Sequence, residues 1–310
     1  MKEIKTVSLI GLGAIGSYFA WNLGPVLGDN FRIIAGGERK KRLEKDGIII
    51  NGEQYYFNIV DPEEKVEPAD LVIVITKFNA LDTAAKDIRN HVGKDTLIMA
   101  PLNGVESEEI LARTYGFDNI IYSVTRVSVL MDGNKTTFNP NLARIEYGEK
   151  TNEVISERVQ RINDLFDKTH INSLIQPDMV YAMWHKYMCN LAENQGSALL
   201  GVPFGAWNGK SEHATALREM IMWEVIEVAK KKGIIFTEAD VKKQGHILTK
   251  VAYNNKSSTL QDLEAKRKTE IDMLSGTFIR IAKEVGVPAP INEFLYHSIK
   301  VLEEKNEGKI

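Results

Sequence analysis

One segment near the N-terminus constrains the fold more than any other. Gly11, Gly13 and Gly16 have the spacing G-x-G-x-x-G, between an apolar run and a helical pattern over Ser17–Leu23. In a strand–turn–helix unit, such glycines permit a tight turn, the approach of a pyrophosphate and close helix packing. The helix start also presents free N–H groups to phosphates. We therefore predict that a dinucleotide binds at Gly11, Leu12, Gly13, Ala14, Ile15 and Gly16; the alternative is a glycine bend without a ligand.

Short apolar runs alternate with helical patterns through the first half of the chain. The runs that we expect to form buried strands are Thr6–Ile10, Phe31–Ala35, Leu71–Thr76, Thr96–Ala100 and Asn119–Val124. Helical patterns cover Ser17–Leu23, Lys40–Lys45 and Leu81–Val92. This alternation predicts an α/β fold with a doubly wound, mostly parallel sheet of the Rossmann type. A β-rich stretch follows, with strands expected at Arg126–Met131, Leu142–Tyr147 and Ile171–Ile175.

The pattern changes after Pro177, where helical periodicity replaces the short apolar runs. Helices are predicted at Met179–Leu200, Glu212–Lys232, Glu238–Ala252, Ser258–Val285 and Ile291–Glu304. A chain of 310 residues is long enough for two domains, each with its own core. We therefore predict a dinucleotide-binding Rossmann domain over residues 1–177 and an all-helical substrate and catalytic domain over 178–310.

Composition limits the partners and the compartment. The formal net charge is −3, with 39 basic and 42 acidic residues, whereas nucleic-acid and membrane-surface partners require a basic excess. Cys189 is the only cysteine, so an intrachain disulfide is impossible and a reducing compartment is favoured. The apolar stretch Val7–Leu23 follows two lysines as a signal peptide does, but glycines with phosphate-binding spacing interrupt it. We expect a cytoplasmic protein that binds neither nucleic acid nor a membrane.

The residues that select the dinucleotide should lie about 20 positions beyond the glycine turn. That position falls on the segment from Ala35 to Arg42, which has glycines at the expected strand end and four basic residues after them. Arg39 and its basic neighbours could hold a 2′-phosphate, which favours NADPH. Glu38 could instead accept a ribose hydroxyl, which would favour NADH, and a solvated helix start is the third reading.

The predicted helix Met179–Leu200 carries a narrow polar stripe on an otherwise apolar surface. Lys186, Asn190 and Asn194 are spaced i, i+4 and i+8, and Glu193 and Ser197 fall on the same side. Such a stripe is solvated, paired or directed at a ligand, because an isolated buried lysine is costly. Two asparagines are poor choices for a plain solvated helix face, so the pattern favours a ligand site over an exposed helix edge.

Carbonyl reduction matches the chemistry of this stripe. Hydride delivery to a carbonyl carbon produces an alkoxide, which needs a positive charge and a proton donor. A lysine that is partly desolvated in a cleft becomes a better acid. Lys186 is therefore the candidate proton donor.

A second polar segment precedes the predicted helix that begins at Ser258. Ser258 and Gln261 have capping-box spacing, which predicts that Ser258 is the N-cap, and a helix start is also a good carboxylate site. Glu270 follows three turns later, and spacing alone predicts a surface salt bridge with Lys266.

Together, these segments resemble the ketopantoate reductase (2-dehydropantoate 2-reductase) family over nearly the whole chain. The resemblance rests on Gly11–Gly16, Ile75-Thr76-Lys77, Leu102-Asn103-Gly104-Val105, Trp184-His185-Lys186 with Asn190 and Asn194, and Ser257–Asp262 with Thr269–Asp272 and Gly276. The glycine turn is common to many folds, whereas the two C-terminal segments are specific. The resemblance implies that the chain reduces ketopantoate with NADPH in pantothenate and coenzyme A synthesis. It also implies an active site in a cleft between a Rossmann domain and a helical domain.

The resemblance also implies a role for each matching residue. Lys186 corresponds to the catalytic general acid and Glu270 to its acidic partner. Asn190 and Asn194 correspond to contacts with the substrate hydroxyl and carbonyl, and Asn255 and Ser258 to contacts with the substrate carboxylate. Lys77 and Asn103 correspond to cofactor contacts near the nicotinamide. The last two also follow strand ends, where ligands bind in doubly wound sheets, although Asn103-Gly104 is equally compatible with a simple turn. We expect no metal ion at this site.

Two departures and three open questions remain. Gly36 stands where the family often has an arginine that contacts the 2′-phosphate, and Gln195-Gly196 follows Asn194 where a more apolar pair is usual. A different branched 2-keto acid is an alternative substrate. A non-catalytic dinucleotide sensor is an alternative of another class, although a sensor has no need to retain both Lys186 and Glu270. The apolar C-terminal helices are compatible with a homodimer and equally with an internal core.

Overall fold

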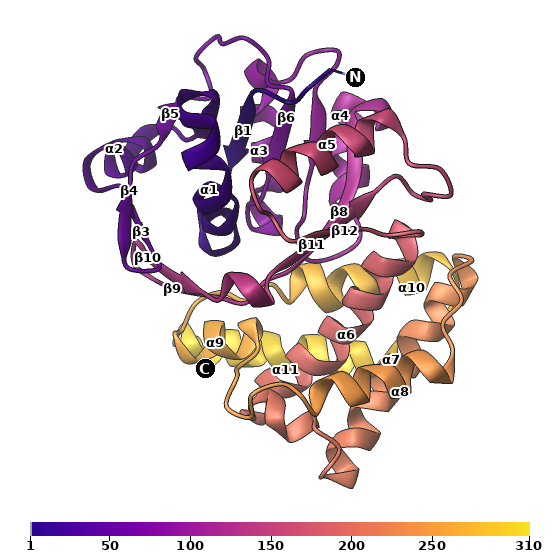
Figure 1. The fold of residues 1–310 in the computed structure, drawn as a ribbon. Helices are drawn as coiled ribbons and strands as arrows, with labels where there is room; N and C mark the ends of the chain where they lie inside the picture. The colour runs from indigo at the N-terminus through magenta and orange to yellow at the C-terminus, as the bar shows by residue number, and fades with distance from the viewer. Residues whose placement is uncertain (1) are drawn as a thin grey trace. The chain divides into compact units, whose positions relative to one another are not determined.

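The computed structural model describes residues 2–310, which form two compact units (Figure 1). The first unit runs to Ala182 and the second from Met183 to Ile310, so the division falls inside a single helix, α6 (Met179–Leu200). We propose the functional boundary at 177/178, just before α6 begins, so that the whole of this continuous helix belongs to the second domain.

The first unit is built on an eight-stranded sheet with the order β12-β11-β8-β7-β6-β1-β2-β5. All neighbouring strands are parallel except β8 and β11. The strands are β1 Val7–Ile10, β2 Phe31–Ile34, β5 Asn58–Val60, β6 Leu71–Val74, β7 Leu97–Met99, β8 Ile120–Arg126, β11 Arg144–Gly148 and β12 Ser173–Ile175. The predicted doubly wound, mostly parallel sheet is confirmed.

Both faces of this sheet are covered, as the continuous apolar strands require. In β6, Leu71 and Ile73 join a core cluster with α1 and α5, whereas Val72 and Val74 join a second cluster with α3 and α4. The helices of this unit are α1 Ala14–Leu27, α2 Gly37–Asp46, α3 Leu81–Asp87, α4 Ser107–Tyr115 and α5 Glu157–Lys168 (Figure 1). Helices α1, α3 and α4 each follow a strand of the large sheet, and the strand ends that precede these helices are available to a ligand.

A second, four-stranded sheet with the order β4-β3-β10-β9 accompanies the large one. Its strands are β3 Ile48–Ile50, β4 Glu53–Tyr55, β9 Val129–Asp132 and β10 Lys135–Phe138. Gly133 and Asn134 make the turn between β9 and β10, and Gly133 has a φ of 57°. The sequence analysis does not predict strands β3 to β5 and β10 or helices α4 and α5, because they are short or have strongly polar faces.

The second unit consists of helices, as predicted. After α6 come α7 Glu212–Lys231, α8 Glu238–Leu248, α9 Ser258–Glu264, α10 Thr277–Glu284 and α11 Pro290–Asn306. One apolar cluster of this unit joins α6, α9, α11 and the chain before α10 through Ala198, Leu260, Leu263, Ile271 and Ile299. None of the helices between residues 2 and 310 combines the length and the apolar character that a membrane crossing requires.

Two helix predictions in this unit are wrong in extent. The helix predicted to reach Ala252 ends at Leu248, because the following chain makes backbone hydrogen bonds from Phe204 to Asn255 and from Gly205 to Tyr253. The single helix predicted over Ser258–Val285 is two helices, α9 and α10. Residues 265–271 leave the helix, with Lys266 at a φ of 54°, and a π turn over Asp272–Gly276 leads into α10.

Candidate active site

The glycine turn joins β1 to α1 and can exist only with glycine at two positions. Gly11 has a φ of 101°, and a Cβ there would lie 2.5 Å from the Ile75 carbonyl oxygen. A Cβ on Gly16 would collide with the Gly11 carbonyl oxygen. These two glycines therefore bring β1, β6 and α1 together at the carboxyl edge of the sheet, as the motif predicts.

The surroundings of Gly13 differ from those of Gly11 and Gly16. The nearest atom to a Cβ at Gly13 would be 4.0 Å away, so the space above this backbone is open. Gly13 is the N-cap of α1, and the N–H groups of the first turn after it lack helical acceptors. An open backbone at a helix N-terminus fits the diphosphate of a dinucleotide, because the N–H groups and the helix dipole both favour negative charge.

The two other predicted contacts of this unit also lie at the carboxyl ends of strands. Lys77 is exposed and follows β6, and Asn103 is half-buried in the loop between β7 and α4. Between Lys77 and the glycine turn, the hydroxyl of Thr76 is buried and has no hydrogen-bond partner within residues 2–310. Gly11 packs against the backbone at Thr76, so this hydroxyl marks a further polar group beside the turn.

Arg39 contacts the glycine turn directly. Its Nη2 donates a 2.5 Å hydrogen bond to the Leu12 carbonyl oxygen, which ties α2 to the turn. Partial burial, with a smaller effect of Arg42, lowers the pKa of Arg39 below its usual value. Glu38, the alternative candidate in this segment, has an 89% exposed side chain and bonds to Lys41 at 2.7 Å.

The polar stripe on α6 divides into two groups. Glu193 accepts a 2.7 Å hydrogen bond from Gln244, and Ser197 accepts a 2.8 Å bond from the Trp207 indole. Asn190 is half-buried and Asn194 only 8% exposed, yet neither side-chain amide has a hydrogen-bond partner within residues 2–310. Because buried amides are normally hydrogen-bonded, these two asparagines fit a ligand-facing role beside Lys186.

The N-cap of α9 differs from the one that the sequence predicts. Ser257, not Ser258, is the N-cap: its hydroxyl accepts from the Leu260 N–H and donates to the Asn194 carbonyl oxygen, both at 3.2 Å. The prediction that Ser258 caps this helix is therefore wrong. Ser258 is the exposed first residue of α9, and exposed Asn255 lies three residues before it. The Ser257–Asn194 bond brings the start of α9 to the polar stripe of α6.

Glu270 lies in the non-helical link between α9 and the π turn. The salt bridge predicted with Lys266 is absent from the described chain, because Lys266 turns back at the end of α9. Thr269 holds the link in place, since its N–H and hydroxyl both donate to the buried carboxylate of Glu303 at 2.7 Å. The Glu270 side chain is half-buried, and this anchoring fixes the backbone that carries it.

Comparison with known proteins decides the family. The model described as "Ketopantoate reductase PanE/ApbA" matches residues 7–152, and "Ketopantoate reductase PanE/ApbA C terminal" matches residues 178–303. The chain belongs to the ketopantoate reductase family. It is accordingly an NAD(P)H-dependent oxidoreductase.

Individual relatives of this family member are distant but aligned over nearly their full length. The 2-dehydropantoate 2-reductase of Pyrococcus horikoshii is 25% identical over 306 residues, which cover 97% of this chain and 99% of the relative. A structure of D-mandelate dehydrogenase with NADH and anilino(oxo)acetate has a TM-score of 0.88 at 23% identity, covering 97% and 99%. A dimeric ketopantoate reductase from Staphylococcus aureus has a TM-score of 0.78 at 18% identity, with the same coverage.

The unusual pair Gln195-Gly196 has a structural explanation in this family member. Gln195 is fully buried, donates to the Leu191 carbonyl oxygen, and accepts from Ser275 in the π turn. A Cβ on Gly196 would lie 2.8 Å from the Trp207 ring. The pair therefore holds the π turn and Trp207 against α6. A buried glutamine in a helix interior was the only sequence signal for this network.

Sequence reasoning also missed Glu108, a buried carboxyl near Asn103. Its carboxyl accepts from the Ser107 hydroxyl at 2.9 Å and from the Ser123 N–H at 3.4 Å, and Ser107 reaches the Ala100 carbonyl oxygen at 3.4 Å. Burial raises the pKa of Glu108 to about 7. These bonds fix both ends of the loop that carries Asn103, so Glu108 supports the site without lying in it.

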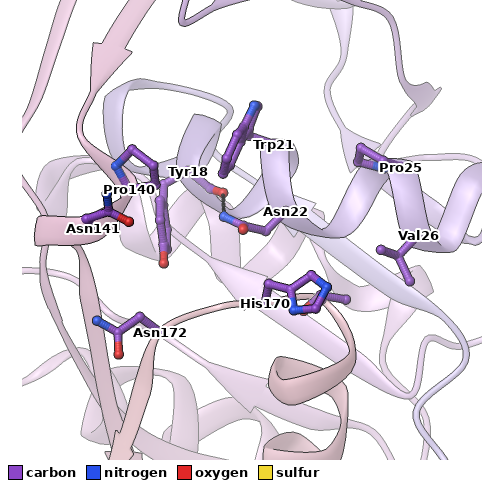
Figure 2. Close-up of a pocket in the computed structure, with 10 residues that line it drawn as sticks. Tyr18, Trp21, Asn22, Pro25, Val26, Pro140, Asn141, His170 and Asn172 are labelled. Carbon is purple, nitrogen blue, oxygen red and sulfur yellow. Dashed lines mark hydrogen bonds between the residues drawn. The ribbon is translucent and has the colours of Figure 1, made fainter.

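A separate cavity of about 540 Å³ lies along the outer side of α1 (Figure 2). Tyr18, Trp21 and Asn22 of α1 line it together with Asn141 and His170. Tyr18 and Trp21 pack against Phe138 of β10, with ring centroids 5.5 and 5.8 Å apart. This cavity therefore belongs to the packing of the small sheet on α1, and the predicted site residues all lie elsewhere.

Proposed function

We propose that this protein reduces ketopantoate to pantoate with a reduced nicotinamide dinucleotide, as a cytoplasmic step of pantothenate and coenzyme A synthesis. The observation that carries the proposal is the set of unpartnered amides, Asn190 and Asn194, on the helix face that also presents Lys186. A 2-keto acid offers the carbonyl, hydroxyl and carboxylate oxygens that such donors bind.

The proposed binding of the keto acid uses both polar segments of the second unit. Asn190 and Asn194 orient the hydroxyl and the carbonyl, while Asn255 and Ser258 bind the carboxylate. Ser258 is free for this role because Ser257 already caps α9.

The proposed chemistry is a hydride and a proton added to one carbonyl group. When bound, the reduced nicotinamide supplies the hydride to the carbonyl carbon. Lys186 stabilises the developing charge on the carbonyl oxygen and gives it a proton, so that the product is an alcohol. Glu270 orients Lys186 and the substrate.

The cofactor would be held by the first unit. The glycine turn takes the diphosphate, Arg39 supports the turn from α2, and Lys77 and Asn103 contact the nicotinamide end. The basic run from Arg39 favours NADPH on sequence grounds. The structure also places the Asp61 carboxylate beside Gly36.

A specific alternative changes the substrate but keeps the chemistry. The structural relative with NADH and anilino(oxo)acetate is a D-mandelate dehydrogenase, and its name supports an aromatic or another bulky 2-keto acid for this chain. A non-catalytic sensor is the second alternative, and it predicts dinucleotide binding without turnover.

The deciding experiment is a panel of 2-keto acids with the purified protein. Ketopantoate, branched aliphatic keto acids and phenylglyoxylate are compared by kcat/KM with each reduced dinucleotide. We expect ketopantoate to have the highest value. A higher value for another keto acid would reassign the substrate, and dinucleotide binding without turnover of any keto acid would support the sensor.

We also propose a homodimer. Met220 and Trp223 of α7 and Phe294 of α11 are large apolar side chains that are exposed on the described chain. A dimer interface would cover exposed apolar side chains of this kind, and the dimeric Staphylococcus aureus relative supports the proposal. Light scattering at several protein concentrations tests this proposal, and Trp223→Glu should shift the mass toward the monomer.

A further inference from the structure

The carboxyl end of β2 carries a carboxylate that β2 itself does not provide. Asp61 directly follows β5, the neighbour of β2 at the sheet edge, and the Ala35 N–H bonds to the Val60 carbonyl oxygen at 3.0 Å. A Cβ on Gly36 would lie 3.4 Å from Asp61 Oδ2. The carboxylate therefore occupies the space next to Gly36, although it comes from a different strand.

This place in a Rossmann sheet selects between the two dinucleotides. An acid at the end of the second strand accepts the ribose 2′-hydroxyl of NAD, whereas an arginine there accommodates the 2′-phosphate of NADP. Gly36 supplies neither group. We propose that Asp61 takes the role of the acid from the adjacent strand and makes NADH the preferred dinucleotide, an inference that rests on the proposed function.

The charges around Asp61 support this assignment. Oδ1 accepts the Glu63 N–H at 3.0 Å, and no lysine or arginine within residues 2–310 forms an ion pair with the carboxylate. Burial raises the pKa of Asp87, Arg89 lowers it, and Glu63 and Asp61 raise it further, so Asp87 lies close enough to interact with both carboxylates. The cation of this group, Arg89, is paired with Glu63 at 2.5 Å. A 2′-phosphate would meet uncompensated negative charge here.

The basic run after Gly36 does not cancel this field. Lys41 pairs with Glu38 and Lys40 lies 3.9 Å from Glu44, both on α2. Arg39 donates to the Leu12 carbonyl oxygen, at the glycine turn that serves either dinucleotide. Arg42 is exposed. Three of the four basic residues therefore have partners on α2 or at the turn, whereas the Asp61 carboxylate lies beside the end of β2.

The test measures dinucleotide binding without a keto acid. Dissociation constants for NADH and NADPH are obtained by calorimetry for the wild type, Asp61→Asn, Gly36→Arg and the control Glu38→Gln. We expect the wild type to bind NADH at least about tenfold more tightly than NADPH, since removing one opposed charge is worth about this factor. Asp61→Asn should reduce the ratio to near unity by strengthening NADPH binding, and Glu38→Gln should not change it.

Gly36→Arg should reverse the preference toward NADPH. Its backbone, with a φ of −118° and a ψ of 172°, accepts any residue, and Pro62 Cδ would be 3.2 Å from the new Cβ. If this variant does not fold, Asp61→Asn still decides. A wild type that prefers NADPH, or an Asp61→Asn change that weakens both dinucleotides equally, would overturn the inference. A preference for NADH without turnover of any keto acid would instead overturn only the proposed function.

Discussion

The two units present different kinds of candidate binding surface. In the first unit, the backbone forms the key surface, and the glycine turn works because Gly11 and Gly16 lack side chains that would collide with Ile75 and Gly11. In the second unit, side chains form the surface, and they come from α6, from the chain before α9 and from the link before the π turn. A backbone site depends on a contiguous motif, whereas a side-chain site depends on how separate helices are held together.

The largest effect on kcat is expected at Lys186. Lys186→Ala should lower kcat by about 10²–10⁴-fold, because a positioned general acid contributes that much. The dinucleotide dissociation constant should remain unchanged, since the first unit binds the cofactor. Lys243→Ala, an exposed lysine of α8, is the matched control. Reduction at the wild-type rate by Lys186→Ala would remove the proposed mechanism.

Substitutions in the glycine turn test the backbone surface of the first unit. Gly16→Ala should destabilise the fold and abolish dinucleotide binding, because its Cβ has no space. Gly13→Ala should leave the thermal midpoint near that of the wild type, because the nearest atom to its Cβ is 4.0 Å away. It should still weaken dinucleotide binding at least about tenfold by blocking the close approach to the backbone. Normal affinity in Gly13→Ala would show that the backbone there is not the binding surface.

Glu108 tests whether the first unit also depends on a buried side chain. Its carboxyl has a pKa of about 7 in the folded protein, above its usual value of 4.5, because burial favours the neutral form. Its contribution to stability is therefore fully present below pH 4.5 and is lost as the pH rises through about 7. The loss is of the order of 3 kcal/mol.

Glu108→Gln should remove this part of the pH dependence of unfolding, as measured by denaturant titrations across the same pH range. Glu109→Gln, an exposed neighbour on α4, is the control and should retain it. An unchanged pH dependence in Glu108→Gln would mean that this carboxyl does not titrate in the neutral range.

The smallest effects are expected at Ser257 and Ser258, at the start of α9. Ser257→Ala should cost about 1 kcal/mol of stability, the usual effect of losing an N-cap, and it also removes the bond to the Asn194 carbonyl oxygen. Ser258→Ala should leave stability unchanged and raise KM for the keto acid about tenfold, as expected for a lost bond to a carboxylate. The opposite pattern would restore Ser258 as the cap.

The predictions that succeeded concern strands and helices whose apolar residues are arranged regularly along the chain. The apolar runs of β1, β2 and β6 and the full extent of α6 follow from periodicity, since a buried strand or helix must be apolar wherever it contacts its neighbours. The break between α9 and α10 could not be predicted in this way. No proline occurs between Ser258 and Val285, and the polar run from Glu264 to Glu270 is as compatible with exposed helical turns as with a break. The break accompanies the bonds of Thr269 to Glu303, which is 34 residues further along the chain.

The features that follow from the sequence alone are those that depend on residues close together in the chain. Steric limits at glycine specify the turn between β1 and α1, and a spacing of four residues places Lys186, Asn190 and Asn194 on one face of α6. Tertiary structure alone decided which serine caps α9, where Glu270 sits, and that Asp61 lies beside Gly36. Each of these depends on a bond or a close approach between segments distant in the chain, and the energy of such contacts leaves no periodic trace in the sequence.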